Sequence, residues 1–427
     1  MRGTDFNRYK KYLEYFITND LSKIGLESGI SYYWFISKVF DFYKTPLFIS
    51  EIYVEPTITA SIQIGNLIFF VFGLLGLYKL LNNLGYRYDE IIKILIILSL
   101  FVPLIGARII LKPEIMAFAF LPWLLFLYNS FFETKNNMFL YLSIPILSSL
   151  VVLKSSITFM IGLSILVIYG KKIINKNFIS INLITFLLTV FLVIENFEIN
   201  GNYLWQHIIE DNYNNKASLS YIYLFNPIEL FQNPFRNELS GSMISIILAD
   251  TFGDYWQRYW FHKDGWSGDI FPGDIMIIRI SLVLSLFFYI FVIFSLLKEK
   301  NKKLQKIGVL GFVGVFALIV NAINLFPFLT KNFDPSKGDP MKTHLFSFLL
   351  SFTLIYFLIK IRLHKNQLVF ISLFVILNIF FFSMAKGVTV SEIRNSSFFL
   401  NKVHVITPCL INDALTERIT YSDSWCS

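Results

Sequence analysis

Long uninterrupted apolar runs constrain this chain more than any other feature of its sequence. Ten runs of 15 to 23 residues are present, and a membrane-spanning helix needs about 20 apolar residues. The runs do not alternate in polarity, which excludes a membrane β-barrel. The sequence therefore predicts an all-α, polytopic transmembrane helix bundle whose extracytoplasmic loops contain short amphipathic helices. The runs are Ile62–Leu81, Ile91–Ala107, Ile115–Phe131, Met138–Leu153, Ser155–Tyr169, Phe178–Phe197, Ile275–Leu297, Ile307–Leu329, Leu345–Ile361 and Leu368–Met384.

The composition excludes soluble, disordered and fibrous classes of protein. Of the 427 residues, 55% are hydrophobic and only 15% are charged, whereas a soluble domain carries about 25% charged residues. The net charge of +8 indicates basic loops, because lysine and arginine collect in the cytoplasmic loops of membrane proteins. We therefore expect membrane lipids as partners and no nucleic acid.

The distribution of basic residues predicts the orientation of the spans. One set of alternate short loops, from Arg87 to Lys365, holds 13 basic residues, and the other set holds 6. The first set is therefore predicted to be cytoplasmic. The alternation requires Met138–Tyr169 to form two short spans, since one long helix would put Lys171 and Lys172 on the wrong side.

This orientation divides the chain into five parts. They are an extracytoplasmic first loop at 1–61, N-terminal transmembrane helices at 62–197, a large extracytoplasmic loop at 198–274, C-terminal transmembrane helices at 275–384 and an extracytoplasmic tail at 385–427. No apolar run precedes the first loop, and we expect that a first membrane helix is missing. Cys409 and Cys426 in the tail either pair or remain free thiols.

Three predicted outer segments carry more polar chemistry than a passive loop needs. Asp5 precedes a short amphipathic helix and either caps it or supplies a carboxylate. Arg108, Lys112 and Glu114 crowd a short loop before the span at Ile115. A functional site explains this charge better than the attraction of Glu114 to the helix dipole does. Lys342 and His344 stand before the span at Leu345, where they either snorkel or help a helix N-terminus to bind a phosphate.

The large loop combines acidic residues with aromatic ones. Asp250, Asp254 and Trp256 lie in the stretch DTFGDYWQRYW, which begins at Asp250. Aromatic residues at this depth form a structural belt, or they contact a sugar ring or a lipid stem. We therefore treat these three residues as candidates for an acceptor-contacting or lipid-facing loop.

These features together resemble the GT-C superfamily of membrane glycosyltransferases. The likeness is to its polyprenyl- or dolichyl-phosphate-sugar-dependent, mannosyltransferase-like branch, apart from the absent first helix. It rests on Asp5, on ARIILKPE ending at Glu114, and on GDPMKTHLFSFLLSF around Lys342. The resemblance implies an inverting enzyme that moves a sugar from a polyprenyl-phosphate donor to a glycan, lipid or protein acceptor on the outer face of the membrane.

The resemblance also implies roles for individual residues. Asp5 corresponds to the catalytic base and Glu114 to the second acidic position, while Arg108, Lys112, Lys342 and His344 are candidates for binding the donor phosphate. Whether a divalent cation bridges the carboxylates stays open. The expected location is the cytoplasmic membrane of a bacterium. The alternatives are an O-antigen ligase or polymerase and, from another class, a secondary transporter or lipid flippase.

Overall fold

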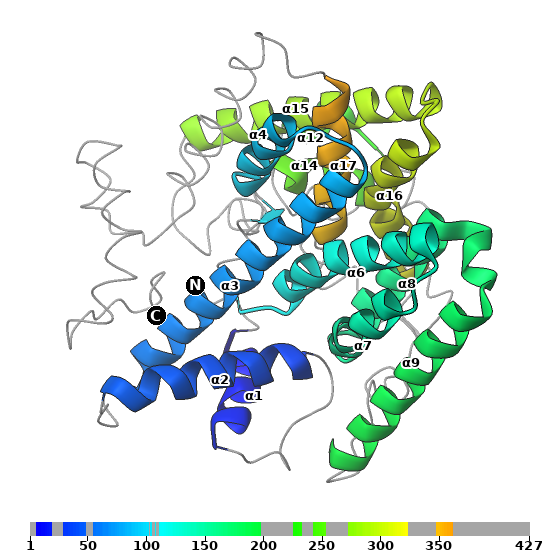
Figure 1. Cartoon of the computed structure of the whole chain (residues 1–427). Coiled ribbons are helices and arrows are strands. Elements are labelled where there is room, and N and C mark those ends of the chain that lie inside the picture. The colour runs from blue at the N-terminus through cyan, green and yellow to red at the C-terminus, as the bar shows by residue number, and fades with distance from the viewer. Residues whose placement is uncertain are drawn as a thin grey trace.

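The computed structural model describes residues 6–18, 29–47, 54–101, 103–104, 107, 111–197, 225–232, 242–252, 272–322 and 347–361. These residues form a bundle of helices without strands (Figure 1), which confirms the predicted all-α class. The elements are α1 (Phe6–Thr18), α2 (Ile30–Leu47), α3 (Val54–Asn83), α4 (Tyr88–Ser99), α6 (Glu114–Thr134), α7 (Met138–Val151), α8 (Ser155–Tyr169), the 3-10 helix η3 (Gly170–Ile174), α9 (Lys176–Phe197), α12 (Pro227–Gln232), α14 (Met243–Phe252), α15 (Pro272–Leu297), α16 (Lys302–Ala322) and α17 (Ser347–Lys360).

Five segments of the described helices are long and apolar enough to cross a membrane. They are Ser61–Asn83, Glu114–Thr134, Ser156–Ile174, Lys176–Val193 and Arg279–Leu297. The length and apolar composition of these segments identify the chain as a helical membrane protein. α9 shows the lipid-facing pattern most clearly, since Leu187, Leu188 and Phe191 are exposed on it.

One predicted break between spans is confirmed, and one predicted span is shorter than expected. The run from Met138 to Tyr169 is broken into α7 and α8 by a turn at 152–154, as the charge alternation requires. The run that begins at Ile91 gives a shorter helix than expected, because α4 ends at Ser99. Pro103 explains this early end, since the residue before a proline is disfavoured in a helix.

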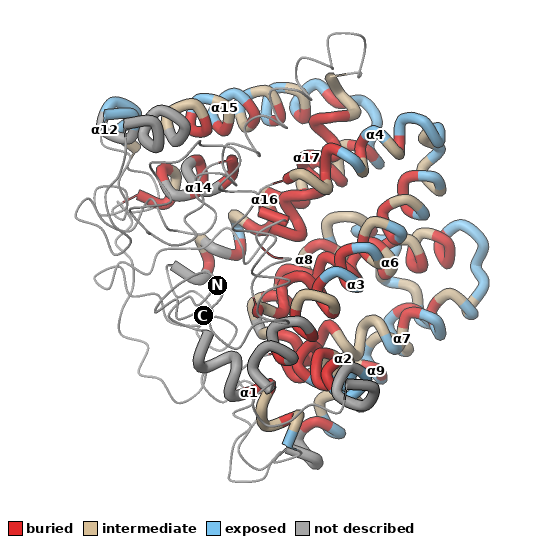
Figure 2. Tube along the Cα trace, turned by 90° about the vertical axis from the view of Figure 1, so that its left-hand side faces the viewer, coloured by how far each residue is buried: buried red, intermediate tan, exposed pale blue. Residues whose placement is uncertain are grey.

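The core is built by close contact between small and aromatic residues. Gly73 of α3 lies against Phe118 of α6, and Gly76 lies against Trp123, so closely that an added Cβ would come within 3.0 Å of those neighbours. The indole Nε1 of Trp123 donates a hydrogen bond of 2.9 Å to the carbonyl of Phe72. Small residues permit such approach between membrane helices, where burial from water does not drive association. Buried residues accordingly concentrate in α6 and α17 (Figure 2).

α16 and α17 make the second close contact between helices. The hydroxyl of Thr353 on α17 accepts a hydrogen bond of 2.9 Å from the Gly311 backbone and donates one of 3.1 Å to the Gly308 carbonyl. A Cβ on Gly311 would lie 2.3 Å from the Thr353 hydroxyl oxygen. Glycine is therefore required at this position for the two helices to pack as they do.

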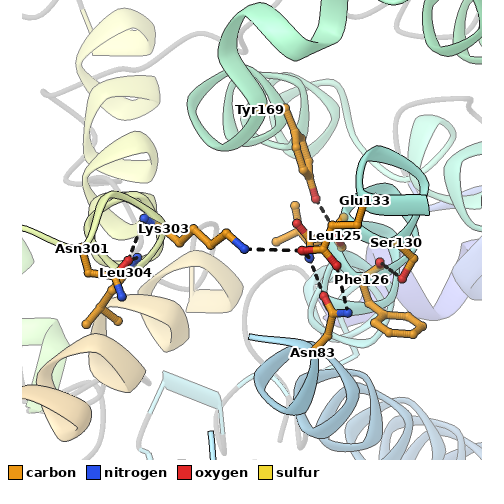
Figure 3. A network of polar contacts seen from close by, with 10 residues as sticks. Asn83, Leu125, Phe126, Ser130, Glu133, Tyr169, Asn301, Lys303 and Leu304 are labelled. Carbon is orange, nitrogen blue, oxygen red and sulfur yellow. Dashed lines mark hydrogen bonds and ion pairs between the residues drawn. The ribbon is translucent and has the colours of Figure 1, made fainter. Parts of the chain in front are cut away.

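The predicted cytoplasmic loops gather at one end of the bundle, which we call the basic end. It comprises the turns 84–87, 135–137, 170–175 and 298–301 and the end of α17. Lys303 of α16 forms an ion pair of 3.4 Å with Glu133 of α6. Asn83 of α3 bonds both Glu133 and Asn129 (Figure 3).

Further polar contacts hold the remaining turns of the basic end together. Lys306 of α16 donates a hydrogen bond of 2.6 Å to the carbonyl of Ile168 on α8, and Glu299 pairs with Lys360 of α17. Burial raises the pKa of Glu299, but the hydrogen bond from Lys360 and nearby backbone donors outweigh it and lower the pKa below its usual value. Burial and the charge of Glu299 raise the pKa of Tyr86 to about 12.

The orientation of the bundle can be tested by thiol accessibility. In a chain with Cys409 and Cys426 replaced by serine, we expect Asn301→Cys to react with an impermeant reagent only after the membrane is permeabilised. Lys38→Cys, on α2, should react in intact cells. Both positions are exposed, so failure to react reports the side of the membrane and not burial. Labelling of both thiols from the same side would contradict the charge-based orientation.

Candidate functional site

Glu114 is the first residue of α6 and lies at the end of that helix opposite the basic end. Pro113 precedes it at the N-cap position, where its fixed φ favours the start of a helix. About 19 helical rises separate Glu114 from Glu133 at the basic end, which corresponds to roughly 28 Å. We call the region around Glu114 the Glu114 end.

Glu114 forms a buried ion pair with Lys154. The Lys154 Nζ lies 2.8 Å from the Glu114 Oε1, and Lys154 occupies the turn between α7 and α8. The Glu114 side chain is 1% exposed, whereas the Lys154 side chain is 17% exposed. Within the described residues, the second carboxylate oxygen of Glu114 is buried without a hydrogen-bond partner. The ion pair therefore gives a partner to one carboxylate oxygen of Glu114 and leaves the other without one. Lys154 is the partly exposed member of the pair.

Two further polar side chains lie beside this pair. The Tyr32 hydroxyl on α2 donates a hydrogen bond of 2.8 Å to the Asn66 Oδ1 on α3, and both residues are fully buried. Burial raises the pKa of Tyr32 well above its usual value, its hydrogen bonds with Asn66 and with the Lys112 backbone oppose that rise, and the negative charge of Glu114 reinforces it. The Tyr32 hydroxyl therefore lies near the carboxylate with its proton already donated to Asn66.

The N-terminus of α2 is fixed directly to the turn that carries Lys154. The Gly29 backbone N–H donates to the Leu153 carbonyl, and the Ser31 hydroxyl donates a 2.8 Å hydrogen bond to the Ser149 carbonyl. Gly29 has a φ of +83°, and a Cβ there would lie 2.7 Å from the Tyr33 ring. A glycine is therefore needed to turn the chain into α2 and place Tyr32 at the Glu114 end.

Of the residues singled out in the sequence, Lys112 and Glu114 lie at this end, two positions apart, and Lys112 is half-buried. Asp250 belongs to α14, but its side chain is not among those described. The other candidates lie outside the described residues; they are Asp5, Arg108, Asp254, Trp256, Lys342 and His344. Cys409 and Cys426 also lie outside them.

Sequence reasoning treated Lys154 only as a loop charge and missed its contact with Glu114. A signal was nevertheless present, because Lys154 is the one charged residue between Met138 and Tyr169. An ionisable residue inside an apolar stretch usually has a partner and a function. Tyr32 and Asn66 carried no comparable signal, since tyrosine is common in this chain and asparagine often hydrogen-bonds within its own helix.

The site has the groups for proton transfer and anion binding. In the described part of the chain, no group of three His, Cys, Asp or Glu side chains is arranged to hold a metal ion. A buried carboxylate can accept a proton from a hydroxyl, and a lysine beside it can bind an anion. Comparisons with protein-family models, curated proteins and solved structures find no match to this chain.

Proposed function

We propose that this protein is a membrane glycosyltransferase that moves a sugar from a polyprenyl-phosphate donor to an acceptor on the outer face of the membrane. The observation that carries the proposal is the buried Glu114–Lys154 ion pair, which lies at the end of the bundle remote from the lysine-rich turns. Taking a carboxylate and an ammonium out of water is costly. Membrane proteins place such groups where substrates or ions are handled.

The chemistry of this transfer matches the groups that the chain offers at its outer side. An acceptor hydroxyl needs a carboxylate to take its proton, and the departing lipid phosphate needs positive charge. Asp5, by the resemblance given above, is the candidate base, and the candidates for binding the phosphate are Arg108, Lys112, Lys342 and His344. A lipid-anchored donor keeps its phosphate near the membrane surface, which is where the end of α6 would lie in a bundle crossing the bilayer.

An enzyme accounts for the polar contacts better than the transporter alternative does. Transporters place broken helices and polar residues near the middle of the membrane. Apart from the exposed Lys38–Asp41 pair within α2, the described ion pairs lie at helix ends or in turns: Lys154 precedes α8, Glu299 follows α15, and Glu133 is one residue from the end of α6. The basic end is also held together by side-chain contacts between four pairs of elements.

The proposal predicts transfer from lipid-phosphate sugars and not from nucleotide sugars. The purified protein in liposomes should release polyprenyl phosphate when given a labelled polyprenyl-phosphate hexose and a panel of glycan, lipid and peptide acceptors. Lys342→Ala should weaken donor binding by about 1.5–3 kcal/mol, as expected for loss of a charge-assisted hydrogen bond. Lys331→Ala, in the same predicted outer loop, is the matched control and should bind the donor like the parent.

Two outcomes would count against the proposal. Transfer from a nucleotide sugar alone would place the protein in another class of enzyme. The absence of transfer from every lipid-linked donor, in protein that still unfolds cooperatively, would remove the enzyme assignment.

A further inference from the structure

The two members of the Glu114–Lys154 ion pair differ in exposure, and this difference indicates that they have different roles. Both groups are charged, but only the lysine retains contact with the surface, at 17% exposure against 1% for the carboxylate. An incoming substrate therefore meets the ammonium group before it meets the carboxylate. The carboxylate, held below it, fixes the position of the ammonium through a contact of 2.8 Å.

We propose that Lys154 contacts the phosphate of the lipid-linked donor and that Glu114 positions Lys154 for this contact. This inference rests on the proposed function and adds to it a phosphate-binding residue that the resemblance did not supply. It also changes the role of Glu114, which becomes a positioning residue. A carboxylate that is 1% exposed does not reach an acceptor hydroxyl in the described conformation.

The Lys154 ammonium group is suited to an anionic ligand, because it is partly exposed and Glu114 fixes its position. An ammonium group close to an apolar surface binds a phosphate more strongly than one in open water, because the surrounding dielectric is low.

The position of Lys154 is set by rigid elements. Lys154 has an extended backbone with φ of −153° and ψ of 141°, and α8 begins at the next residue. Its carbonyl accepts hydrogen bonds from the backbone N–H of Thr158, at 2.8 Å, and from the Thr158 hydroxyl, at 2.9 Å. The turn is also tied to α2 through Gly29. A binding group held from three helices is preorganised, which reduces the entropy lost when a ligand binds.

The test measures binding of undecaprenyl phosphate, the lipid product of the proposed reaction, to the full chain in lipid nanodiscs. Lys154→Met alone leaves Glu114 buried without a cation and risks loss of the fold. The informative variant is therefore the double substitution Glu114→Gln with Lys154→Met, which removes both charges together. Lys154→Arg keeps the cation, and Lys38→Met removes an exposed lysine of α2 that pairs with Asp41.

We expect the double variant to bind undecaprenyl phosphate about 10- to 100-fold more weakly than the parent, as for loss of a charge-assisted hydrogen bond. Lys154→Arg should stay within a few-fold of the parent, and Lys38→Met should match it. If the double variant binds undecaprenyl phosphate as tightly as the parent does, the inference is overturned even if sugar transfer is observed. If the parent binds undecaprenyl phosphate but transfers no sugar, the proposed function fails and the phosphate contact is judged by the variants alone. If the parent does not bind it, the inference fails.

Discussion

Replacing Glu114 with alanine is expected to destabilise the protein strongly and to abolish sugar transfer. The substitution leaves Lys154 partly buried without the carboxylate that now lies 2.8 Å away. Removal of one partner from a buried ion pair typically costs about 3–5 kcal/mol. The measurement is the midpoint of thermal unfolding in detergent, followed by the transfer assay on the protein that remains folded.

A double variant separates the structural part of this effect from the functional part. Glu114→Gln combined with Lys154→Met removes both charges and keeps side chains of similar volume. Neutral replacement of a buried pair is often tolerated, so most of the lost stability should return. Transfer should remain low, because the phosphate has lost a cation. Recovery of both stability and transfer would show that the pair serves the fold alone.

Asp5→Asn provides the comparison at the proposed base. It should leave the unfolding midpoint and undecaprenyl phosphate binding unchanged while turnover is lost, because it removes a proton acceptor and not a phosphate contact. The separation of Asp5 and Glu114, which we predict to be within roughly 12 Å because the catalytic base must lie close to the phosphate-binding end, stays a prediction. Full turnover in Asp5→Asn would remove the main catalytic residue of the glycosyltransferase proposal.

Gly311→Leu is expected to separate α16 from α17 and to lower stability by roughly 3 kcal/mol, the upper end of typical overpacking effects. Even a Cβ at this position would lie 2.3 Å from the Thr353 hydroxyl oxygen. The larger side chain also disrupts the two hydrogen bonds between Thr353 and the glycine backbones. The unfolding midpoint of the purified variant measures the effect.

Gly162→Leu is the matched control, because nothing lies within 4 Å of a Cβ added to that glycine of α8. Its unfolding midpoint should stay near that of the parent. The smaller substitution Gly311→Ala should also lower stability. Adding Thr353→Ala should reduce that loss, so that the effects of the two substitutions on stability are not additive. A stable, parent-like Gly311→Leu variant would mean that the two helices are not packed as closely as described.

Local sequence predicted the positions of most of the described apolar helices, whereas the site required contacts between distant segments. Apolar runs and loop charge predicted the break between α7 and α8, because both signals are read within a few tens of residues. α6 begins at Glu114, one residue before the span predicted from Ile115. The partner of Glu114 could not be predicted in this way, since Lys154 is 40 positions away. Tyr32 and Asn66 likewise meet across 34 positions, where no pattern of spacing applies.

The separation of Glu114 and Lys154 along the chain also has a consequence for biogenesis. Ribosomes add about 5–20 residues per second, so the 40 positions between the two residues correspond to roughly 2–8 s of synthesis. During this interval, α6 carries a carboxylate whose counter-charge has not yet been made. Release of α6 into lipid before the α7–α8 turn emerges would expose that charge to a medium that solvates it poorly. The segment from α6 to α8 is therefore expected to leave the insertion machinery as one unit.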